Sequence, residues 1–586
     1  MNFKFPINLN DFVLREKKYL KFAKKLVCTQ EFNVKFLGGY TQNITADWLE
    51  IFLRSNKINP EISQSDWGPA SYFLEDYSVF ESHLDLIVVF ILPQDFYPLS
   101  RNSVNLDNPE LITDKLESLL EECKNRQINV AISILEADLI CFPAPLRNSS
   151  FLSFMSDFNH ELNRLSKKYK NLYLYSLANI CSGFDVAGLS SPRNWYNFGQ
   201  PLSPNSSFLL ANYLRNLIRG LLGLAKKVLI TDLDNTLWGG VIGDDGVSGI
   251  MLGNETPEGR IYADIQHYIL KLKERGIFIS IASKNEPEIA EEAFSSEHSV
   301  LKLTDFTYST INWDRKSENI KKICEFLNIG LDSVLFLDDN PVEREEVKRS
   351  YPEIEVLDVS SDPYAFLQAL KFTDPFCSEI DISREDQLRN KTIEFKKKEE
   401  LQKQSSTSYS EFLKNLDIEL HFQDINENNF SRCLQLNNKT NQFNFTTCRL
   451  KQDELMKISK DRNHDILTYS VKDKFCEYGL VGVVFLEFAE TTMTIKNWIM
   501  SCRVFNKTIE HAVINKIISI AREKDIRYLL IQYIPSKKNK VVKGFLEELN
   551  CKPASQDNDS SKDDLQIWSL EVTEVHSEKS YVRLIY

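Results

Sequence analysis

The sequence predicts an α/β protein made of three domains. The chain has 586 residues, and a single hydrophobic core rarely extends beyond about 250–300 residues, so several cores are needed. Short apolar runs of strand length alternate with amphipathic stretches of helix length, a pattern typical of parallel sheets covered by helices. Hydrophobic residues make up 42% of the chain, which is ample for such cores. We expect domains at 1–220, 221–381 and 411–586, with the charged stretch 382–410 as a solvated linker or helix.

The first predicted domain alternates regularly between strands and helices. We expect strands at 32–39, 85–92, 128–136 and 171–180, and helices at 45–56, 111–126 and 153–169. A loop over 182–204 and a further helix complete the domain near Arg219. This order predicts a doubly wound parallel sheet.

The second predicted domain contains three apolar runs that each end in polar side chains. Val228–Ile230 is followed by Asp232 and Asp234, and Val334–Leu337 is followed by Asp338 and Asp339. The third run, residues 277–282, ends in Ser283, Lys284 and Asn285. Parallel strands present their carboxyl ends at one edge of the sheet, where ligands of open α/β sheets bind.

Charge balance at this edge predicts a divalent cation. Carboxylates that lie close together repel one another unless a cation stands between them, and oxygen-rich sites suit Mg²⁺. Lys316 precedes a helical stretch in the same region and brings a positive charge toward the same edge. The simpler alternative for the first acid pair, taken by itself, is an Asp-rich turn that caps a helix.

The segment between the first two of these strands is short. Only 46 residues separate Thr236 from Ser283, and they must hold a turn, a helix and a strand. We therefore expect no large cap domain over the site. Such a site accepts a bulky substrate, with neighbouring domains as its cover.

The third predicted domain combines strands and helices without strict alternation. Strands are expected at 416–423, 465–471, 478–487 and 493–501, and helices at 509–525 and 540–549. The sequence therefore predicts a mixed α+β domain.

Composition excludes several classes of protein. The formal net charge of −13 argues against a nucleic-acid binder, which needs a basic surface. The longest apolar run, Leu86–Leu92, is far shorter than the roughly 20 residues that span a bilayer, so no membrane partner is expected. The 11 cysteines are scattered without a CxxC pair, which argues against a zinc knuckle or redox dithiol. With no apolar signal segment at the start, we expect a cytoplasmic protein with reduced thiols.

The motifs of the second domain resemble those of the haloacid dehalogenase (HAD) superfamily. Asp232-Leu-Asp234-Asn-Thr236, Ser283, Lys316 and Asp338-Asp339 match its four motifs in order. The flanking segments DLDNTLWGGVIGDDG, SKNEPEIAEEAF and LFLDDNPVEREEV are similar to its FkbH-like branch. This resemblance extends from about Leu221 to about Asp525.

The resemblance implies a role for each motif residue. Asp232 is the expected nucleophile, since a carboxylate can attack phosphorus and form an aspartyl phosphate. Asp234 is the expected acid and base. Ser283 and Lys316 are expected to bind the transferred phosphoryl group. The expected Mg²⁺ ligands are Asp232, Asp234, Asp338 and Asp339, and the expected substrate-binding residues of this domain are Gly239, Gly240 and Asn285.

The first domain resembles the SGNH hydrolase fold but lacks its catalytic residues. Its first strand ends in Gly38-Gly39-Tyr40-Thr41, where the hydrolases carry a serine. No histidine stands between His160 and His267, and a serine hydrolase without its histidine lacks a general base. We expect a catalytically inert scaffold or partner-binding module.

The third domain resembles a GNAT acyltransferase. The segment Arg503-Val-Phe-Asn-Lys-Thr508 aligns with the pyrophosphate-binding loop of that fold, yet both of its glycines are replaced. The FkbH-like resemblance implies that Cys502 carries a glyceryl thioester and that Arg503 lowers its pKa; the alternative is a buried core cysteine. Asn437, Thr440, Asn441 and Gln442 are expected to line the acyl site, or else to cap a turn.

Together these resemblances imply an enzyme that transfers a glyceryl unit. It would take a phosphorylated three-carbon acid such as 1,3-bisphosphoglycerate, remove phosphate, and load the glyceryl group as a thioester on the phosphopantetheine arm of an acyl carrier protein, as in polyketide biosynthesis. One alternative is a HAD phosphatase of a sugar or acid phosphate fused to an N-acyltransferase. Another is a non-catalytic assembly module.

Overall fold

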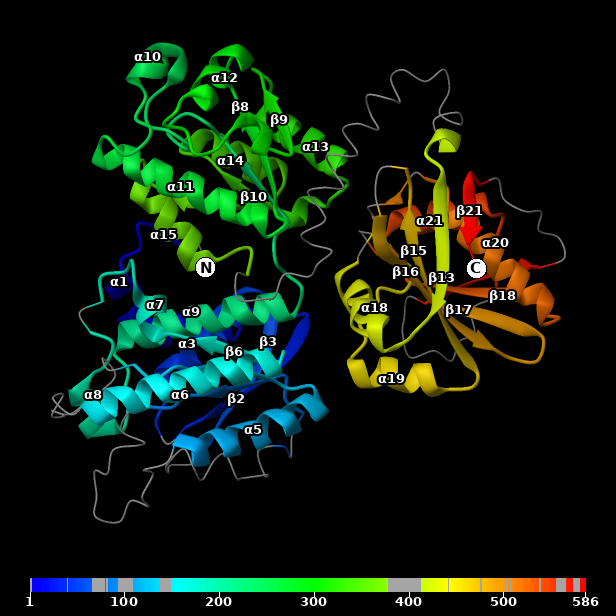
Figure 1. Cartoon of the computed structure of the whole chain (residues 1–586), viewed down its shortest axis with the longest axis horizontal. Helices are drawn as coiled ribbons and strands as arrows, with labels where there is room; N and C mark the ends of the chain where they lie inside the picture. The colour runs from blue at the N-terminus through cyan, green and yellow to red at the C-terminus, as the bar shows by residue number, and fades with distance from the viewer. Residues whose placement is uncertain are drawn as a thin grey trace. The chain divides into compact units, whose positions relative to one another are not determined.

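The structure is a computed structural model, and it describes most of the chain (Figure 1). The described residues are 3–38, 40–65, 80, 83–92, 109–136, 149–186, 188–377, 413–440, 442–474, 477–501, 504–505, 507–536, 539–554, 565–572 and 580–585. The predicted linker at 382–410 lies outside these residues. The chain divides into two compact units, Met1–Ala225 with Leu357–Asp381, and Lys226–Val356 with Ile382–Tyr586.

The first unit contains the predicted doubly wound parallel sheet. Its strands, in the spatial order β3-β2-β4-β5-β6, are all parallel. The strands are β2 (Gln30–Leu37), β3 (Ile58–Gln64), β4 (Leu86–Val89), β5 (Asn129–Ser133) and β6 (Leu172–Tyr175). Strand β3 is an addition to the prediction. It lies at the sheet edge, where its polar sequence and Pro60 are tolerated, so it lacks the apolar run of a central strand.

Helices cover this sheet and build its core. They are α1 (Leu9–Val13), α2 (Glu16–Ala23), α3 (Asn43–Ser55), α5 (Pro109–Arg126), α6 (Ser149–Lys168), α7 (Leu177–Cys181), α8 (Pro192–Phe198) and α9 (Pro204–Leu221). Side chains of β4 and β5 such as Ile87 and Val130 pack with Leu116 of α5 and Phe158 of α6 in one buried cluster. Helix α8 lies inside the predicted 182–204 loop, where the Ser191 side chain caps its start.

A segment from beyond the second domain's core belongs to the first unit. Strand β1 (Lys4–Phe5) pairs in parallel with β12 (Asp358–Val359), and α15 (Pro363–Thr373) follows. The Phe372 ring lies 4.9 Å from the Phe3 ring and 5.9 Å from the Phe208 ring, measured between centroids. Residues 357–381 are therefore grouped with 1–225, whereas the sequence assigned them to the second domain.

Phe372 is expected to be a major contributor to the stability of the first unit, because its side chain is 1% exposed. We expect Phe372→Ala to lower the free energy of unfolding of this unit by about 3–5 kcal/mol, through lost burial and the cavity left behind. Urea unfolding measures the change. Phe198→Ala is the matched control, because Phe198 is 63% exposed. Equal effects of the two substitutions would contradict the assigned packing.

The second unit begins with a five-stranded parallel sheet, drawn in green in Figure 1. Its order is β11-β10-β7-β8-β9, which places the three predicted strands β10, β7 and β8 in the middle. The strands are β7 (Val228–Thr231), β8 (Phe278–Ser283), β9 (Tyr308–Ile311), β10 (Val334–Leu337) and β11 (Glu355–Val356). The helices are α10 (Ile242–Gly249), α11 (Pro257–Glu274), α12 (Pro287–Ser295), α13 (Lys316–Leu327) and α14 (Pro341–Ser350).

The register of this sheet positions the functional side chains. Thr231 of β7 is paired with Leu337 of β10 and with Ile281 of β8. The next residues, Asp232 and Asp338, therefore leave neighbouring strands at the same level. The expectation of converging carboxyl ends follows directly from this pairing.

The connection between β7 and α11 is small, as the short spacing required. The backbones of Gly239 and Met251 form a two-residue bridge, with N–H to O distances of 3.0 and 2.8 Å. Helix α10 is the only helix that separates Thr236 from α11, a stretch that is described throughout. Helix α11 then starts at Pro257, with the Thr256 hydroxyl as its cap.

The C-terminal part of the second unit is a mixed sheet, drawn in yellow to red in Figure 1. Its order is β19-β20-β18-β17-β16-β15-β13-β21, and β14 pairs with β17. The strands are β13 (Ile418–Asp424), β14 (Phe443–Asn444), β15 (His464–Lys472), β16 (Glu477–Phe488), β17 (Thr492–Met500), β18 (Tyr528–Tyr533), β19 (Lys552–Pro553), β20 (Gln566–Glu571) and β21 (Val582–Ile585). The helices are α18 (Glu427–Lys439), α19 (Gln452–Lys460), α20 (Ile509–Glu523) and α21 (Lys540–Glu548).

This sheet contains all four predicted strands, β13, β15, β16 and β17, and both predicted helices, α20 and α21. Strands β17 and β18 pair in parallel only over Thr492–Ile495, and beyond that point β14 lies between them. The Phe445 N–H donates to the Trp498 carbonyl at 3.2 Å, and the Ile534 N–H donates to the Phe445 carbonyl at 2.9 Å. The chain thus fills the gap between the two strands with its own backbone.

No helix within the described residues combines the length and the apolar character that a bilayer crossing requires. This agrees with the short apolar runs of the sequence.

Candidate active site

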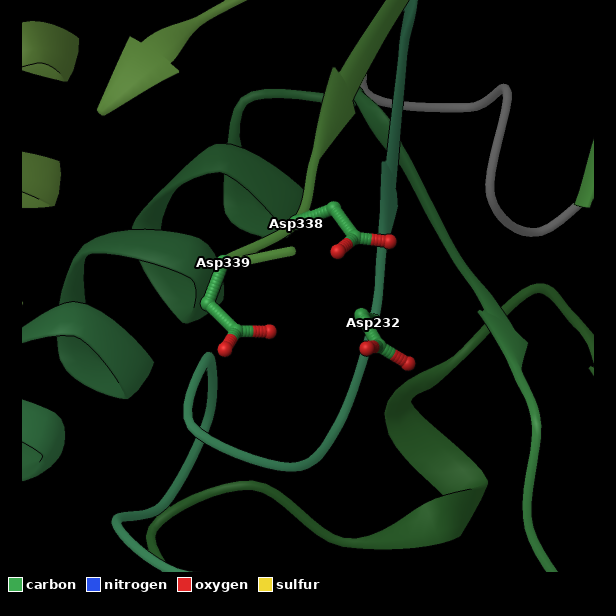
Figure 2. A group of neighbouring side chains, drawn as sticks. All are labelled: Asp232, Asp338 and Asp339. Atoms are coloured by element: carbon green, nitrogen blue, oxygen red, sulfur yellow. The ribbon is translucent and has the colours of Figure 1, made fainter. Parts of the chain in front are cut away.

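Three carboxylates converge at the carboxyl edge of the green sheet. Asp232 follows β7, and Asp338 and Asp339 follow β10; Figure 2 shows their side chains turned toward one another. One oxygen from each lies within 4.8 Å of the others. Asp338 is fully buried and Asp232 is 8% exposed. Hard oxygen ligands at this spacing fit a divalent cation such as Mg²⁺.

Lys316 inserts its ammonium group between two of these acids. The Nζ atom lies 2.8 Å from Asp232 Oδ2 and 2.5 Å from Asp338 Oδ2. Burial by itself lowers the pKa of Lys316, but the charges of Asp232 and Asp338 outweigh it and raise that pKa. The lysine is therefore a fixed positive charge at the centre of the site. It is the first residue of α13, so the helix start sets its position.

The backbone around Asp338 and Asp339 is held by a network of hydrogen bonds. The Asn340 N–H donates to Asp338 Oδ1 at 2.8 Å, and the Asp339 N–H donates to the Thr236 hydroxyl at 3.2 Å. Arg344 donates to the carbonyls of Asp338 and Asp339 at 2.9 and 2.7 Å. Burial raises the pKa of Asp338 to about 6, against the opposing effect of Lys316. Burial, together with the charge of Asp232, also raises the pKa of Asp339.

Asp234 lies in different surroundings from Asp232. Its Oδ1 accepts hydrogen bonds from the Trp238 indole at 2.9 Å and from the Ile242 N–H at 3.0 Å. Its Oδ2 accepts from the Asn285 amide at 3.0 Å. Burial raises the pKa of Asp234, and the hydrogen bonds from Ile242 and Trp238 offset only part of that rise. A carboxyl group held in this way suits proton transfer.

Ser283 and Asn285 reach the same edge from β8. Ser283 ends that strand, is 1% exposed, and accepts the Asn312 N–H at its carbonyl at 3.0 Å. The register continues from Thr231 and Ile281, so Ser283 follows β8 two residues after the partner of Thr231. Asn285, expected to bind substrate, instead donates to Asp234 and accepts from the Glu286 N–H.

Gly239 and Gly240 have structural reasons to be glycine. A Cβ atom on Gly239 would lie 2.8 Å from side-chain atoms of Met251 and Tyr262. Gly240 has a φ of +98° and would place a Cβ 2.7 Å from Asp245 Oδ2. Both glycines therefore let the loop after Asp234 fold tightly back, which explains them without a contact to substrate.

Trp238 and Arg344 are site residues that the sequence reasoning did not single out. Trp238 is fully buried and reaches Asp234 only because the loop turns back on itself. Arg344 is buried in α14 and looks like an ordinary charged helix residue in the sequence. Neither has a local pattern that would have revealed its partner.

The predicted residues of the third domain are described only in part. Cys502, Arg503 and Asn441 lie outside the described residues. Gln442 is half-buried and directly precedes β14. The Asn437 amide donates to the Cys448 carbonyl at 3.0 Å, a loop-closing role of the kind that the turn alternative describes.

A buried polar group not anticipated from the sequence lies in the same domain. Lys507 donates to Asp473 at 2.7 Å and to the Tyr478 hydroxyl at 2.6 Å. The Tyr478 hydroxyl in turn donates to Asp473 at 2.8 Å. Lys507 belongs to the segment aligned with the pyrophosphate-binding loop, and its charge is compensated by these partners inside the domain.

Comparison with solved structures places these observations among known proteins. The chain is similar to the N-terminal part of the protein BF1531 from Bacteroides fragilis, which contains a phosphatase domain complexed with Mg. The identity is 27% over 62% of this chain and 98% of that chain, with a TM-score of 0.54.

Two acetyltransferases also match over a smaller part. One is an N-acetyltransferase from Staphylococcus aureus Mu50, with 15% identity, 26% of this chain, 99% of that chain and a TM-score of 0.21. The other is spermidine N-acetyltransferase from Vibrio cholerae, with 14% identity, 26% of this chain, 96% of that chain and a TM-score of 0.22. A comparison with protein-family models found no match, and a comparison with curated proteins found none.

The charge balance around Lys316 leads to a prediction about stability. Lys316→Met removes the positive partner of two buried acids, and such a change costs about 3–5 kcal/mol. The variant raises the pKa of Asp338 further above its value of about 6. The folded state then binds protons that the unfolded state releases, so the loss is greatest above pH 6 and shrinks toward pH 4.

Thermal unfolding at pH 5 and pH 8 measures this dependence. Lys322→Met is the matched control on the same helix. Lys322 pairs with Asp314 at 2.9 Å, but both side chains are half exposed, so we expect little change in stability. A pH-independent loss in the Lys316 variant would contradict the assigned ion pairs.

Proposed function

We propose that the chain is a Mg²⁺-dependent phosphatase of the HAD type, with Asp232 as its nucleophile. The observation that carries this proposal is the convergence of Asp232, Asp338 and Lys316 at one sheet edge. The similarity to a phosphatase domain complexed with Mg supports it. The matching order of the sequence motifs supports it independently.

The proposed metal site uses the carboxylates already described. Asp232, Asp338 and Asp339 would hold the ion, because each offers an oxygen within the same 4.8 Å. When bound, Mg²⁺ would neutralise charge on the phosphoryl oxygens and so favour attack by an anion. Lys316 supplies a second positive charge from the protein itself.

The proposed reaction has two steps. In the first, an Asp232 carboxylate oxygen forms a bond to phosphorus while the bond to the leaving oxygen breaks, and Asp234 gives that oxygen its proton. In the second, Asp234 takes a proton from water, which attacks phosphorus and releases Asp232 and inorganic phosphate. Ser283 donates a hydrogen bond to a phosphoryl oxygen, and Lys316 balances the charge.

The division of roles between the two acids follows from their surroundings. Asp232 faces Lys316, which keeps a carboxylate ionised and ready to attack. Asp234 is away from that lysine's hydrogen bonds, and burial favours its protonated form. Trp238 and Asn285 fix its orientation. Two carboxyl groups with different environments are the usual way to obtain an anion and an acid in one site.

We further propose the substrate class that the FkbH-like resemblance implies. The substrate is a phosphorylated three-carbon acid, and the product is a glyceryl thioester on an acyl carrier protein. The small α10 connection supports this, because it leaves the site without a large cap. The acyl step would use the GNAT-like C-terminal domain, with Cys502 and Arg503 as the proposed thioester residues.

The phosphatase proposal predicts the effect of one substitution. Asp232→Asn removes the attacking anion and should lower phosphate release from a small phosphate ester by at least about 1,000-fold. EDTA should abolish the wild-type rate, and added Mg²⁺ should restore it. Phosphate release measured by a colorimetric assay tests both effects.

The control for this experiment is Asp264→Asn. Asp264 is an exposed acid on α11, so its loss should leave the rate unchanged. A thermal unfolding midpoint near that of the wild type would show that the Asp232 variant is folded. Full activity in a folded Asp232→Asn variant would refute the nucleophile assignment.

The carrier-loading proposal has its own experiment. Incubation with 1,3-bisphosphoglycerate, Mg²⁺ and an acyl carrier protein that bears its arm should add the mass of one glyceryl group to the carrier. Intact-protein mass spectrometry detects this gain, and Cys502→Ser should abolish it while phosphate release persists. Phosphate release without any mass gain would leave a simple phosphatase.

A further inference from the structure

The helix pair at the start of the first unit carries a basic surface on an acidic protein. Between Leu14 and Val27, six side chains are basic and one, Glu16, is acidic. The six are Arg15, Lys17, Lys18, Lys21, Lys24 and Lys25, and all are exposed. The whole chain has a formal net charge of −13, so this concentration of positive charge differs sharply from the average surface.

The single acid in this segment does little to cancel the charge. Burial and the neighbouring Asp47 raise the pKa of Glu16 to about 7. Glu16 is therefore about half protonated at neutral pH. Lys24 lies 3.8 Å from Glu50 of α3, a long and partly solvated pair.

Large apolar side chains are exposed among these basic residues. Leu14 is 86% exposed, Phe22 is 64% exposed and Val27 is 83% exposed. Single exposed apolar residues are common, but a group of them within one basic segment marks an interaction surface. We refer to these three residues and the six basic ones as the α2 surface.

An apolar groove of about 320 Å³ opens beside Phe22. Its walls come from α1, α2 and α3, including Phe12, Tyr19, Phe22, Leu26, Ile51 and Ser55. The Tyr19 ring packs 6.0 Å from the rings of both Phe12 and the buried Trp48, so the core supports the groove. A rigid concave site of this kind receives a protruding apolar side chain of a partner.

We propose that the α2 surface docks an acidic protein helix with exposed apolar side chains, and that its occupant is the acyl carrier protein of the proposed reaction. Positive side chains around an apolar groove complement such a helix in both charge and shape. The identity of the occupant rests on the proposed function, since carrier loading requires a docked carrier.

An anionic membrane is the main competing occupant, because basic amphipathic helices also bind such membranes. The observations favour a protein. A membrane-bound helix inserts a continuous apolar face, whereas α2 has only eight residues and uses Tyr19 and Ala23 toward the groove. The apolar feature here is a hollow, which needs a knob rather than a lipid interior.

Two variants of the full chain test the surface. Lys17→Glu/Lys21→Glu reverses charge on α2, and Phe22→Ala removes one wall of the groove. Lys167→Glu/Lys170→Glu is the matched control, because it makes the same charge change at exposed lysines elsewhere in the same unit. The probes are an acyl carrier protein without its arm, the same protein with its arm, and vesicles of phosphatidylglycerol and phosphatidylcholine.

Isothermal titration with the arm-free carrier reports docking alone. We expect both α2 variants to weaken binding about 10-fold or more, and the control to remain within about 2-fold. Wild-type binding should weaken as salt rises from about 0.05 to about 0.5 M, because exposed charges are screened. Phosphate release from a small ester should be unchanged in all variants.

The outcomes separate this proposal from the proposed function. Loss of carrier binding and of loading only in the α2 variants supports both. Normal loading in the α2 variants overturns the docking proposal and leaves the function intact. Carrier binding that depends on α2 without any loading supports the surface and overturns the glyceryl-transfer function. Vesicle binding without carrier binding, or no binding of either probe, overturns the docking proposal.

Discussion

The buried ion cluster of Lys316, Asp232 and Asp338 is the constraint on which the catalytic sheet depends. An isolated charge inside a protein costs several kcal/mol, so each of these groups requires the others at hydrogen-bonding distance. The pairing of β7 with β10 brings the two acids to the same level, and the start of α13 brings the lysine. The surrounding contacts of Thr236, Asn340 and Arg344 then hold the loops that carry the acids.

The same cluster explains how one short motif holds two different carboxyl groups. Asp232 and Asp234 are separated by one residue, but only Asp232 contacts Lys316. The chain turns back after Asp234 through Gly239 and Gly240, and this turn delivers the Trp238 indole and the Ile242 N–H to Asp234. The tight fold of a small loop therefore sets the chemistry of the second acid. A large cap domain is not needed for that purpose.

The first unit has features suited to recognition rather than to chemistry. Its parallel sheet lacks the serine and histidine of a hydrolase in the sequence, and its helices α1 and α2 present the α2 surface. The chain leaves this unit after residue 225 and returns to it at residue 357, where β12 pairs with β1. The proposed phosphatase core is thus connected to this unit at both of its ends. Aromatic packing around Phe372 anchors the returning segment.

The sheets could be predicted largely from local pattern, and the exceptions have physical causes. Central strands such as β4, β7 and β10 are apolar on both faces, so they stand out as uninterrupted runs. Strand β3 is a polar edge strand, and the apolar run of β18 was not distinguished from the end of the preceding helix. Segment 357–381 was assigned to the wrong neighbour in the sequence because a strand pair and aromatic contacts across more than 300 residues decide its place.

The candidate site divides in the same way. The sequence by itself determined that Asp232, Asp338 and Lys316 belong to one site, because each follows a strand or starts a helix whose direction is set by local pattern. Only the tertiary structure decided that Trp238 and Asn285 hold Asp234, that Arg344 holds the loop after β10, and that α2 borders an apolar groove. These contacts join side chains whose own segments carry no sign of a partner, and only the folded chain brings them within hydrogen-bonding or packing distance.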